Sequence, residues 1–195
     1  MSSRDTILSL VKRNQPKHAP LPKLQNFGET VTAVIEKYKT VLQAIGGNVF
    51  EVSNYNEAAS IIQAQFKNEK RLVTVNDAFV AIAELYQSGK DAHLLHDVDV
   101  AIIDAHFAVA ENSSIWITED LVKERVLPFI CQHLVAIVSK NSVVATMHDA
   151  YEIIADSEYG FGTFIAGPSK TADIEQSLVL GAHGPKTMTV LIIAD

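Results

Sequence analysis

The sequence predicts an α/β fold with three layers around a mostly parallel sheet. Between Thr30 and Val75, apolar stripes at helical spacing alternate with short β-leaning segments. This alternation is typical of parallel strands joined by helical crossovers. Farther along, residues 134–139 (LVAIVS) form a continuous apolar run, the pattern of a strand that is covered on both faces. The 195 residues, 48% of them hydrophobic, are enough for one domain with a sizeable core.

The first 27 residues are predicted to stand apart from a single domain over residues 28–195. Ile7, Leu8 and Val11 recur at helical spacing, with Asp5 in the first turn, so residues 3–14 are expected to form a short amphipathic helix. Three prolines follow between residues 15 and 27 and indicate an extended arm. Such an arm either lies across a partner subunit or remains a loose tail.

Within the domain, apolar residues at helical spacing predict helices over residues 30–45, 53–66 and 146–155. A further helix is expected to begin at Asn76 and Asp77 and to run through Tyr86. Apolar, β-leaning runs predict strands over residues 48–52, 71–75, 134–139 and 187–193. We expect the following strand residues to be buried: Val73, Val100, Ile102, Val135, Ile137, Val190 and Ile192.

Between Val98 and Thr118 the pattern changes. Three apolar runs (VDVAIID, FAVA and SIWIT) follow one another closely and leave little room for crossover helices. Antiparallel pairing or an irregular layer is therefore expected in this part.

Composition excludes several classes of function. The 16 Lys and Arg against 23 Asp and Glu give a net charge of −7, which argues against a nucleic-acid surface. No apolar run is long enough for a membrane helix, and residues 1–15 lack the apolar core of a signal peptide, so a cytoplasmic location is expected. Cys131 is the one cysteine, which rules out an intrachain disulfide and a four-cysteine iron–sulfur site, and no cofactor is predicted in this chain.

The stretch over residues 166–185 (AGPSKTADIEQSLVLGAHGP) carries the candidate ligand-binding residues. A Gly-Pro turn leads into small polar residues and then into an expected helix through Ile174 and Leu178, followed by a second turn. A helix beginning there would offer free N–H groups and a positive dipole end to an anion, although capping alone explains any one of the polar residues. The predicted ligand-binding residues are Gly167, Ser169, Lys170, Thr171, Asp173 and Gly184.

Glu111 and His183 are the candidate catalytic residues. His183 stands between two glycines, and its ordinary pKa suits acid–base chemistry near neutral pH. Glu111 follows the apolar run FAVA at an expected strand end. A turn histidine and a solvated carboxylate are the alternative readings. His93 and His96 form an i,i+3 pair without a further ligand at suitable spacing, so no metal site is predicted.

The segment GPSKTADIEQSLVLGAHGP resembles the C-terminal signature of the lactate-utilisation protein C family, the LUD-domain proteins. A weaker match runs back through AVAENSSIWI to about Val98. The resemblance implies the fold of the sugar-isomerase and CoA-transferase superfamily. It also implies a role in the oxidation of L-lactate to pyruvate, as an accessory or substrate-binding subunit beside iron–sulfur partner proteins.

Two other functions remain open at this stage. The AENS segment resembles the Ser-Glu-Asn-Gly motif of some CoA transferases, whose Glu is the nucleophile; Glu111 and Asn112 match, whereas Ala110 and Ser113 do not. A stand-alone isomerase or CoA-transferase-like enzyme would act on a small anionic substrate with Glu111 as base or nucleophile and His183 as acid. A structural assembly subunit without a ligand is the third possibility.

Overall fold

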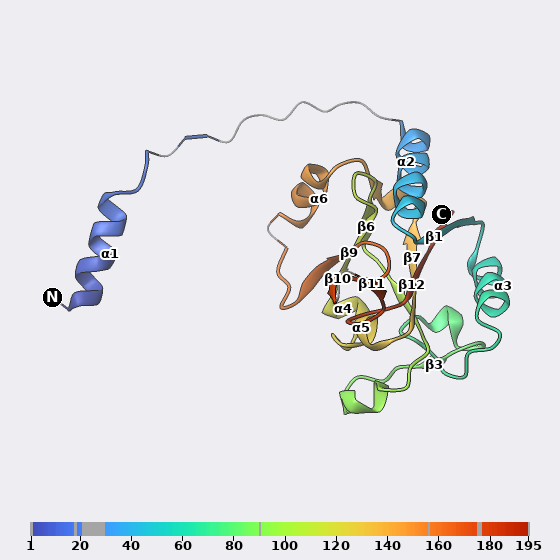
Figure 1. The fold of residues 1–195 in the computed structure, drawn as a ribbon. Coiled ribbons are helices and arrows are strands. Elements are labelled where there is room, and N and C mark those ends of the chain that lie inside the picture. The colour runs from blue at the N-terminus through green and yellow to red at the C-terminus, as the bar shows by residue number, and fades with distance from the viewer. Residues whose placement is uncertain are drawn as a thin grey trace.

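The computed structural model describes residues 2–17, 19–20, 30–89, 91–155, 157–174 and 177–194. Within these ranges, the largest element is a sheet of six strands that all run parallel, in the order β1-β12-β7-β4-β2-β3 (Figure 1). Its strands are β1 (Asn48–Val52), β2 (Leu72–Thr74), β3 (Glu84–Leu85), β4 (Val100–Asp104), β7 (His133–Ser139) and β12 (Thr187–Ile193). The prediction of an α/β fold around a mostly parallel sheet is confirmed.

A second, smaller sheet lies against the first and has the order β8-β5-β6-β9. Its strands β5 and β6 pair antiparallel, as do β6 and β9, so the expected antiparallel pairing is confirmed for the runs FAVA and SIWIT. The run VDVAIID departs from this expectation, because it forms β4, which pairs parallel with β2 and β7 in the large sheet. These strands are β5 (Phe107–Val109), β6 (Ser114–Thr118), β8 (Val143–Val144) and β9 (Gly162–Ile165).

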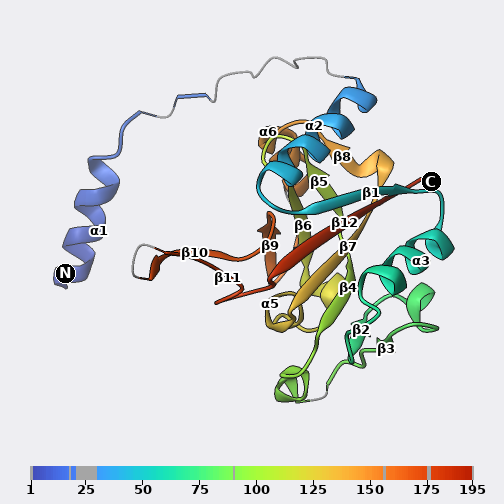
Figure 2. The ribbon, with the colours of Figure 1, turned by 45° about the vertical axis from the view of Figure 1, so that its right-hand side comes forward.

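The layers follow from which side chains share a core. One face of the parallel sheet packs on α3 (Tyr55–Gln65) through Ala58 and Ile62. The other face packs on α2 (Val31–Ala44) and on the inner face of the second sheet, which together form the largest core. The outer face of the second sheet is covered by α6 (Met147–Ile154), and the two short helices α4 (Glu119–Val122) and α5 (Leu127–Ile130) follow β6 (Figure 2).

Local sequence explains where the main helices begin. Thr30 and Asn54 accept hydrogen bonds from backbone N–H groups in the first turns of α2 and α3. Thr146 and Asp149 form a reciprocal capping box at the start of α6. These caps satisfy N–H groups that have no partner within the helix.

The helix predicted over residues 76–86 is wrong. Asn76 does accept a hydrogen bond from the Ala78 N–H group, but only a short 3-10 turn over Asp77–Phe79 follows. The chain then extends into β3, where Leu85 pairs with Thr74 of β2. The apolar run in this segment is short and fits a helix and a strand about equally well. Pairing with β2 at the edge of the sheet therefore decides its conformation.

The predicted helix within residues 166–185 is also wrong. The chain forms an antiparallel hairpin of β10 (Lys170–Ile174) and β11 (Ser177–Leu180), with Lys170 opposite Leu180 and Ile174 opposite Ser177. The helix dipole that was expected to attract an anion is therefore not formed at this place.

The N-terminal helix is confirmed as α1 (Ser3–Arg13), with a capping box between Ser2 and Asp5. None of its residues is buried, and Figure 1 shows it apart from the other elements. The predicted arm over residues 15–27 falls largely outside the described residues. Among the described helices, none is long and apolar enough to cross a membrane.

Candidate functional site

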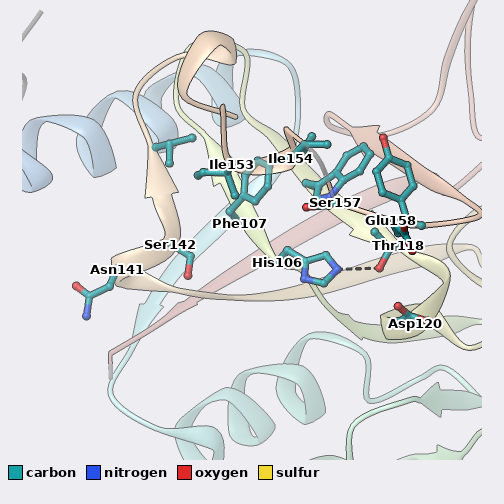
Figure 3. A pocket seen from close by; sticks show the side chains of 13 residues that line it. His106, Phe107, Thr118, Asp120, Asn141, Ser142, Ile153, Ile154, Ser157 and Glu158 are labelled. Carbon is teal, nitrogen blue, oxygen red and sulfur yellow. Dashed lines mark hydrogen bonds between the residues drawn. The ribbon is translucent and has the colours of Figure 1, made fainter. Parts of the chain in front are cut away.

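A cavity of about 480 Å³ lies beside α6, on the outer face of the second sheet (Figure 3). Residues that follow the carboxyl ends of β4 and β7 line part of it. Open α/β sheets bind ligands at this edge, beyond the carboxyl ends of their strands. Its lining combines aromatic, aliphatic and polar side chains: His106, Phe107, Trp116, Thr118, Asp120, Asn141, Ser142, Val144, Ile153, Ile154, Ser157, Glu158 and Tyr159.

The apolar wall of the cavity is built from aromatic rings. Phe107 and Trp116 stack on neighbouring strands with ring centroids 6.4 Å apart, and the rings of Tyr159 and Trp116 form a T-shaped contact with centroids 5.4 Å apart. A Cβ atom at Gly162 would come within 2.5 Å of the Trp116 ring, so only glycine lets β9 pass this close. The rings hold one another in place and leave a rigid surface toward the cavity.

His106 is the titratable ring in the wall. Its Nε2 lies 2.7 Å from the hydroxyl of Thr118, a hydrogen bond whose donor depends on the imidazole tautomer. Burial lowers the pKa of His106, and the carboxylate of Asp120 opposes this in part. The ring is therefore neutral near neutral pH and can take up a proton from a bound molecule.

The charged side chains that line the cavity are both acidic. Asp120 and Glu158 contribute carboxylates, and no lysine or arginine is among the described lining residues. The nearby cations have their own acidic partners, since Lys140 pairs with Glu51. The cavity therefore favours positive charge over negative charge.

One wall is a segment that is clamped to α4. The Gly160 N–H group donates to Glu119 at 3.1 Å, and Arg125 donates to the same carboxylate at 2.5 Å. Arg125 also lies over the ring of Phe161, 5.6 Å from its centroid. These contacts fix the segment that carries Ser157, Glu158 and Tyr159 and lower the pKa of Glu119, chiefly through the bond from Arg125.

The structure places Glu111 at the turn between β5 and β6, outside the cavity. Its carboxylate accepts a hydrogen bond from the Met147 N–H group at 2.8 Å, at the first residue of α6. That N–H group has no acceptor within the helix, so Glu111 supplements the capping box. A structural role accounts for this contact, and the predicted catalytic role of Glu111 stays a prediction.

The two turns that flank the hairpin pack against each other. The Ser169 N–H group donates to the Pro185 carbonyl at 2.9 Å, and the Gly181 N–H group donates to the Ser169 carbonyl at 3.0 Å. A Cβ atom at Gly184 would lie 3.2 Å from the Ser169 Cβ. The N–H group of Ser169 is thus occupied within the chain and is not offered to an anion.

The other predicted ligand-binding residues are distributed around these turns. Gly167 is buried beside Ile45, Thr171 is half-buried, and Lys170 and His183 are exposed. The side chain of Asp173 lies outside the described residues. The structure thus brings Ser169 and Gly184 together, and the predicted anion site stays a prediction, now without the helix on which it depended.

Register relates Glu111 to this region. Strands β6 and β9 pair antiparallel with Ile115 opposite Ile165, so the turn that holds Glu111 and the beginning of the hairpin segment lie at the same end of the second sheet. The register relates only the starts of these two segments, and the Glu111 carboxylate is directed at α6.

Sequence reasoning missed the cavity. Phe107 and Trp116 stand in the apolar runs FAVA and SIWIT and are largely buried, yet both also line the cavity. The available signal was the position of His106 and Asn141 just after two apolar strands, because polar side chains at such positions gather at one edge of a parallel sheet. Asp120 likewise comes shortly after the apolar run SIWIT, whereas Glu158 carries no comparable signal.

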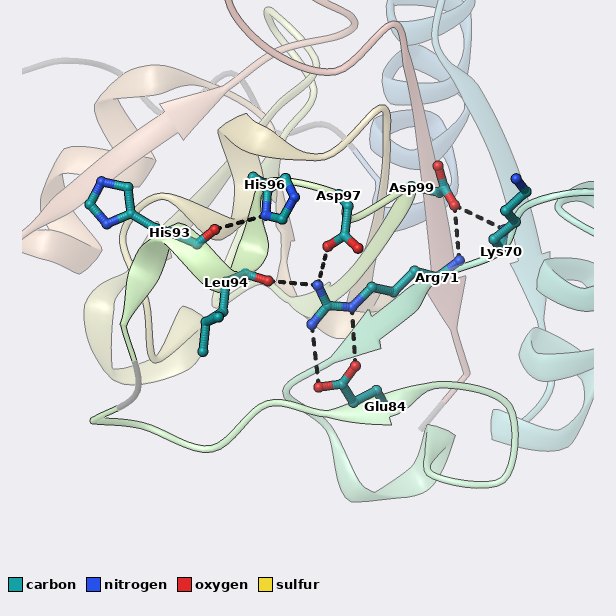
Figure 4. Close-up of polar contacts among 8 residues, drawn as sticks. All are labelled: Lys70, Arg71, Glu84, His93, Leu94, His96, Asp97 and Asp99. Carbon is teal, nitrogen blue, oxygen red and sulfur yellow. Dashed lines mark hydrogen bonds and ion pairs between the residues drawn. The ribbon is translucent and has the colours of Figure 1, made fainter.

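The histidine pair of the sequence analysis belongs to another surface. His96 Nδ1 bonds the carbonyl of His93, whose own ring lies 2.8 Å from Asp91 and is 95% exposed. Nearby, Arg71 ties β2 to Glu84 and Asp97, an arrangement that fixes loops (Figure 4). In the part of the chain that the structure describes, no three His, Cys, Asp or Glu residues are placed to hold a metal ion.

The parallel sheet, the mixed second sheet and the cavity beside α6 define an α/β domain of two packed sheets. Residues 89–193, more than half of the chain, match the LUD domain family, and the chain therefore belongs to that family.

The chain is also similar to several curated proteins called lactate utilization protein C. It is 26% identical to the one from Geobacillus sp. (strain WCH70), over 99% of this chain and 80% of that protein. It is 28% identical to the one from Macrococcus caseolyticus, over 87% of this chain and 69% of that protein. It is 34% identical to the one from Anoxybacillus flavithermus, but over only 45% of this chain and 40% of that protein.

Among solved structures, the fold is similar to that of a DUF162 family protein from Deinococcus radiodurans. The TM-score is 0.68, with 17% identity over 85% of this chain and 99% of the other. At this identity the likeness establishes the fold alone.

Proposed function

We propose that this chain is a component of an L-lactate utilisation system, in which it serves as an accessory subunit beside iron–sulfur partner proteins in the cytoplasm. The single observation that carries the proposal is the similarity to the Geobacillus relative named lactate utilization protein C, which extends over 99% of this chain.

Two considerations favour an accessory role. Oxidation of L-lactate to pyruvate releases two electrons and two protons, and the electrons must pass to an acceptor. A chain with one cysteine cannot supply four cysteine ligands to an iron–sulfur cluster, so we assign the cluster to a partner. In addition, the acidic lining of the cavity disfavours a lactate anion there.

Growth tests the proposal. Deleting the gene in its own host should abolish growth on L-lactate as sole carbon source and leave growth on glucose unchanged, and the wild-type gene should restore growth. Unchanged growth on L-lactate would show that the chain is not needed for lactate utilisation.

The accessory role has a separate test. A tagged chain isolated from its host should bring down a protein that contains iron, whereas the purified chain alone should not reduce a dye at the expense of L-lactate. Dye reduction by the isolated chain would instead make it the oxidising enzyme.

The second candidate is a stand-alone isomerase or CoA-transferase-like enzyme that acts on a small anionic substrate, with Glu111 as base or nucleophile and His183 as acid. The register of β6 and β9, which brings the Glu111 turn and the hairpin segment to one end of the second sheet, favours it. The anion would then contact Ser169, Lys170 and Thr171.

A thermal-shift screen separates the two candidates. Lactate, pyruvate, sugar phosphates and acyl-CoAs are added one at a time, because a ligand that binds the native state raises the midpoint of unfolding. A shift with a sugar phosphate or an acyl-CoA that is lost in Glu111→Gln and His183→Asn supports the enzyme, and the absence of any such shift removes its main support.

A further inference from the structure

We propose that the cavity beside α6 binds an organic cation with a flat, apolar body. The cavity joins an aromatic wall to two carboxylates, and neither the LUD domain match nor the relatives' names assign it a ligand. The inference stands apart from the lactate role, so either one can fail without the other.

The charged side chains of the lining determine which ligand charge the cavity favours. Asp120 and Glu158 are both exposed side chains on the cavity lining, and the described lining offers no lysine or arginine to neutralise them. Arg125 is engaged with Glu119 outside the lining. An anionic ligand would meet only repulsion from these groups, whereas an ammonium group would be attracted by both carboxylates.

The aromatic wall sets the shape of the ligand. Phe107, Trp116 and Tyr159 present ring surfaces, and Ile153 and Ile154 add aliphatic area from α6. A ring buried between them gains hydrophobic contact, and a cation held over a Trp or Tyr face gains further attraction from the ring. The volume of about 480 Å³ is in the usual range for sites that hold a small organic molecule.

The polar groups allow such a ligand to be oriented. The Thr118 hydroxyl and Ser157 lie on the lining with the two carboxylates, and Figure 3 shows Thr118, His106 and Asp120 close together at one end of the cavity. Phe107, Ile153 and Ile154 lie along another side of the cavity, and Asn141 and Ser142 lie at the end away from Asp120. A molecule whose amine is directed at the carboxylates and whose ring packs on the hydrophobic side fits this arrangement.

The test uses three probes that share one ring and differ in charge: 2-phenylethylamine, 2-phenylethanol and 3-phenylpropionate. Trp116 is the only tryptophan of the chain and lines the cavity, so its fluorescence reports binding there. We expect the amine to bind at least about tenfold more tightly than the carboxylate, with the alcohol between them. Added salt should weaken binding of the amine and leave the alcohol unchanged.

Variants then locate the charge effect. Asp120→Asn and Glu158→Gln should each weaken binding of the amine by roughly two- to fivefold, the size expected for partly exposed ion pairs, and should leave the alcohol unaffected. Glu152→Gln is the matched control, because this exposed residue of α6 carries the same charge but does not line the cavity. All three changes are at exposed positions, so the fold is expected to persist.

The proposal is overturned by any of three results. The carboxylate binds as tightly as the amine, or the amine causes no saturable change in Trp116 fluorescence up to millimolar concentration, or Glu152→Gln weakens the amine as much as the two lining variants do. The growth test on L-lactate does not depend on any of these outcomes.

Discussion

At His106, burial and a neighbouring carboxylate act on one imidazole in opposite directions. Burial is the larger effect and lowers the pKa of the ring below its ordinary value, which is about 6.5. Between the two pKa values the unfolded chain binds a proton that the folded chain does not. The stability gained from a neutral ring is therefore present above about pH 6.5 and is lost as the pH falls below it.

His106→Gln should accordingly flatten the acid side of the stability curve. Urea unfolding at several pH values between neutral and mildly acidic measures the slope. His148→Gln is the control, since this histidine is exposed on α6. An equal effect of the two substitutions would mean that burial at His106 is not the cause.

A second test at the residue scale asks whether Glu111 caps helix α6 or acts in catalysis. Its carboxylate receives the Met147 N–H group at the start of α6. Glu111→Ala should cost roughly 0.5–1 kcal/mol in unfolding free energy, the usual loss for a removed N-terminal cap. Glu111→Gln keeps an acceptor oxygen and should cost less.

Function separates the two roles of Glu111. A structural cap predicts that Glu111→Gln still complements the deletion strain on L-lactate. If the chain is stable with this substitution but fails to complement, the carboxylate itself is needed, and the catalytic assignment is supported.

At the scale of elements, the turn before β10 depends on Gly167. Its φ of +68° is in the left-handed region, and a Cβ atom there would lie 2.7 Å from the Ile45 side chain at the end of α2. Gly167→Ala should therefore lower the free energy of unfolding by roughly 2 kcal/mol or more, because the backbone is strained and Ile45 must move. Unfolding in urea measures the loss.

Gly89→Ala is the matched control. Gly89 has a φ of +85° but nothing within 4 Å of an added Cβ atom. Gly89→Ala should therefore lower the free energy of unfolding by about 1 kcal/mol, through backbone strain alone. Equal costs at the two positions would indicate that the turn at Gly167 can move away from α2 without loss.

The elements that sequence could predict are those whose pattern is repeated along the chain. The stripe of α2 and the apolar runs of β4, β7 and β12 are long enough to fix their own conformation. The two wrongly predicted helices, over residues 76–86 and within residues 166–185, involve short segments in which apolar spacing fits a helix and a strand equally well. There, pairing with another strand decided the outcome.

The candidate site was less predictable than the fold, for a geometric reason. Its lining comes from β5, β6, β8, α4, α6 and the segments after β4, β7 and α6, and no two of these contributions are joined by a motif. Phe107 and Trp116 stand in apolar runs, which predict burial. A ring that is buried on one side and faces a cavity on the other stands in the same kind of run as a fully buried ring, so the sequence does not distinguish the two. Only the paired strands bring Phe107 opposite Trp116.

At the scale of the whole molecule, the parallel sheet is buried on both of its faces. All seven strand residues that were predicted to be buried are at most 3% exposed, and they divide between the two faces of the sheet. Ile102→Ala should cost on the order of 2–4 kcal/mol, because the sheet cannot collapse around the lost side chain. A loss below about 1 kcal/mol in urea unfolding would contradict tight packing at this position.

The N-terminal helix makes the opposite case. Ile7, Leu8 and Val11 are 60%, 54% and 54% exposed, and α1 has no buried residue, so α1 contributes little to the core of the same chain. A chain that lacks residues 2–17 should therefore unfold at the same temperature as the full chain at low protein concentration.

If the arm instead lies across a second copy, the full chain should gain stability as concentration rises, and the shortened chain should not. Thermal unfolding of both chains over a hundredfold range of concentration distinguishes these cases. A lower midpoint for the shortened chain at every concentration would show that α1 packs within its own chain, and it would contradict the division between residues 1–27 and 28–195.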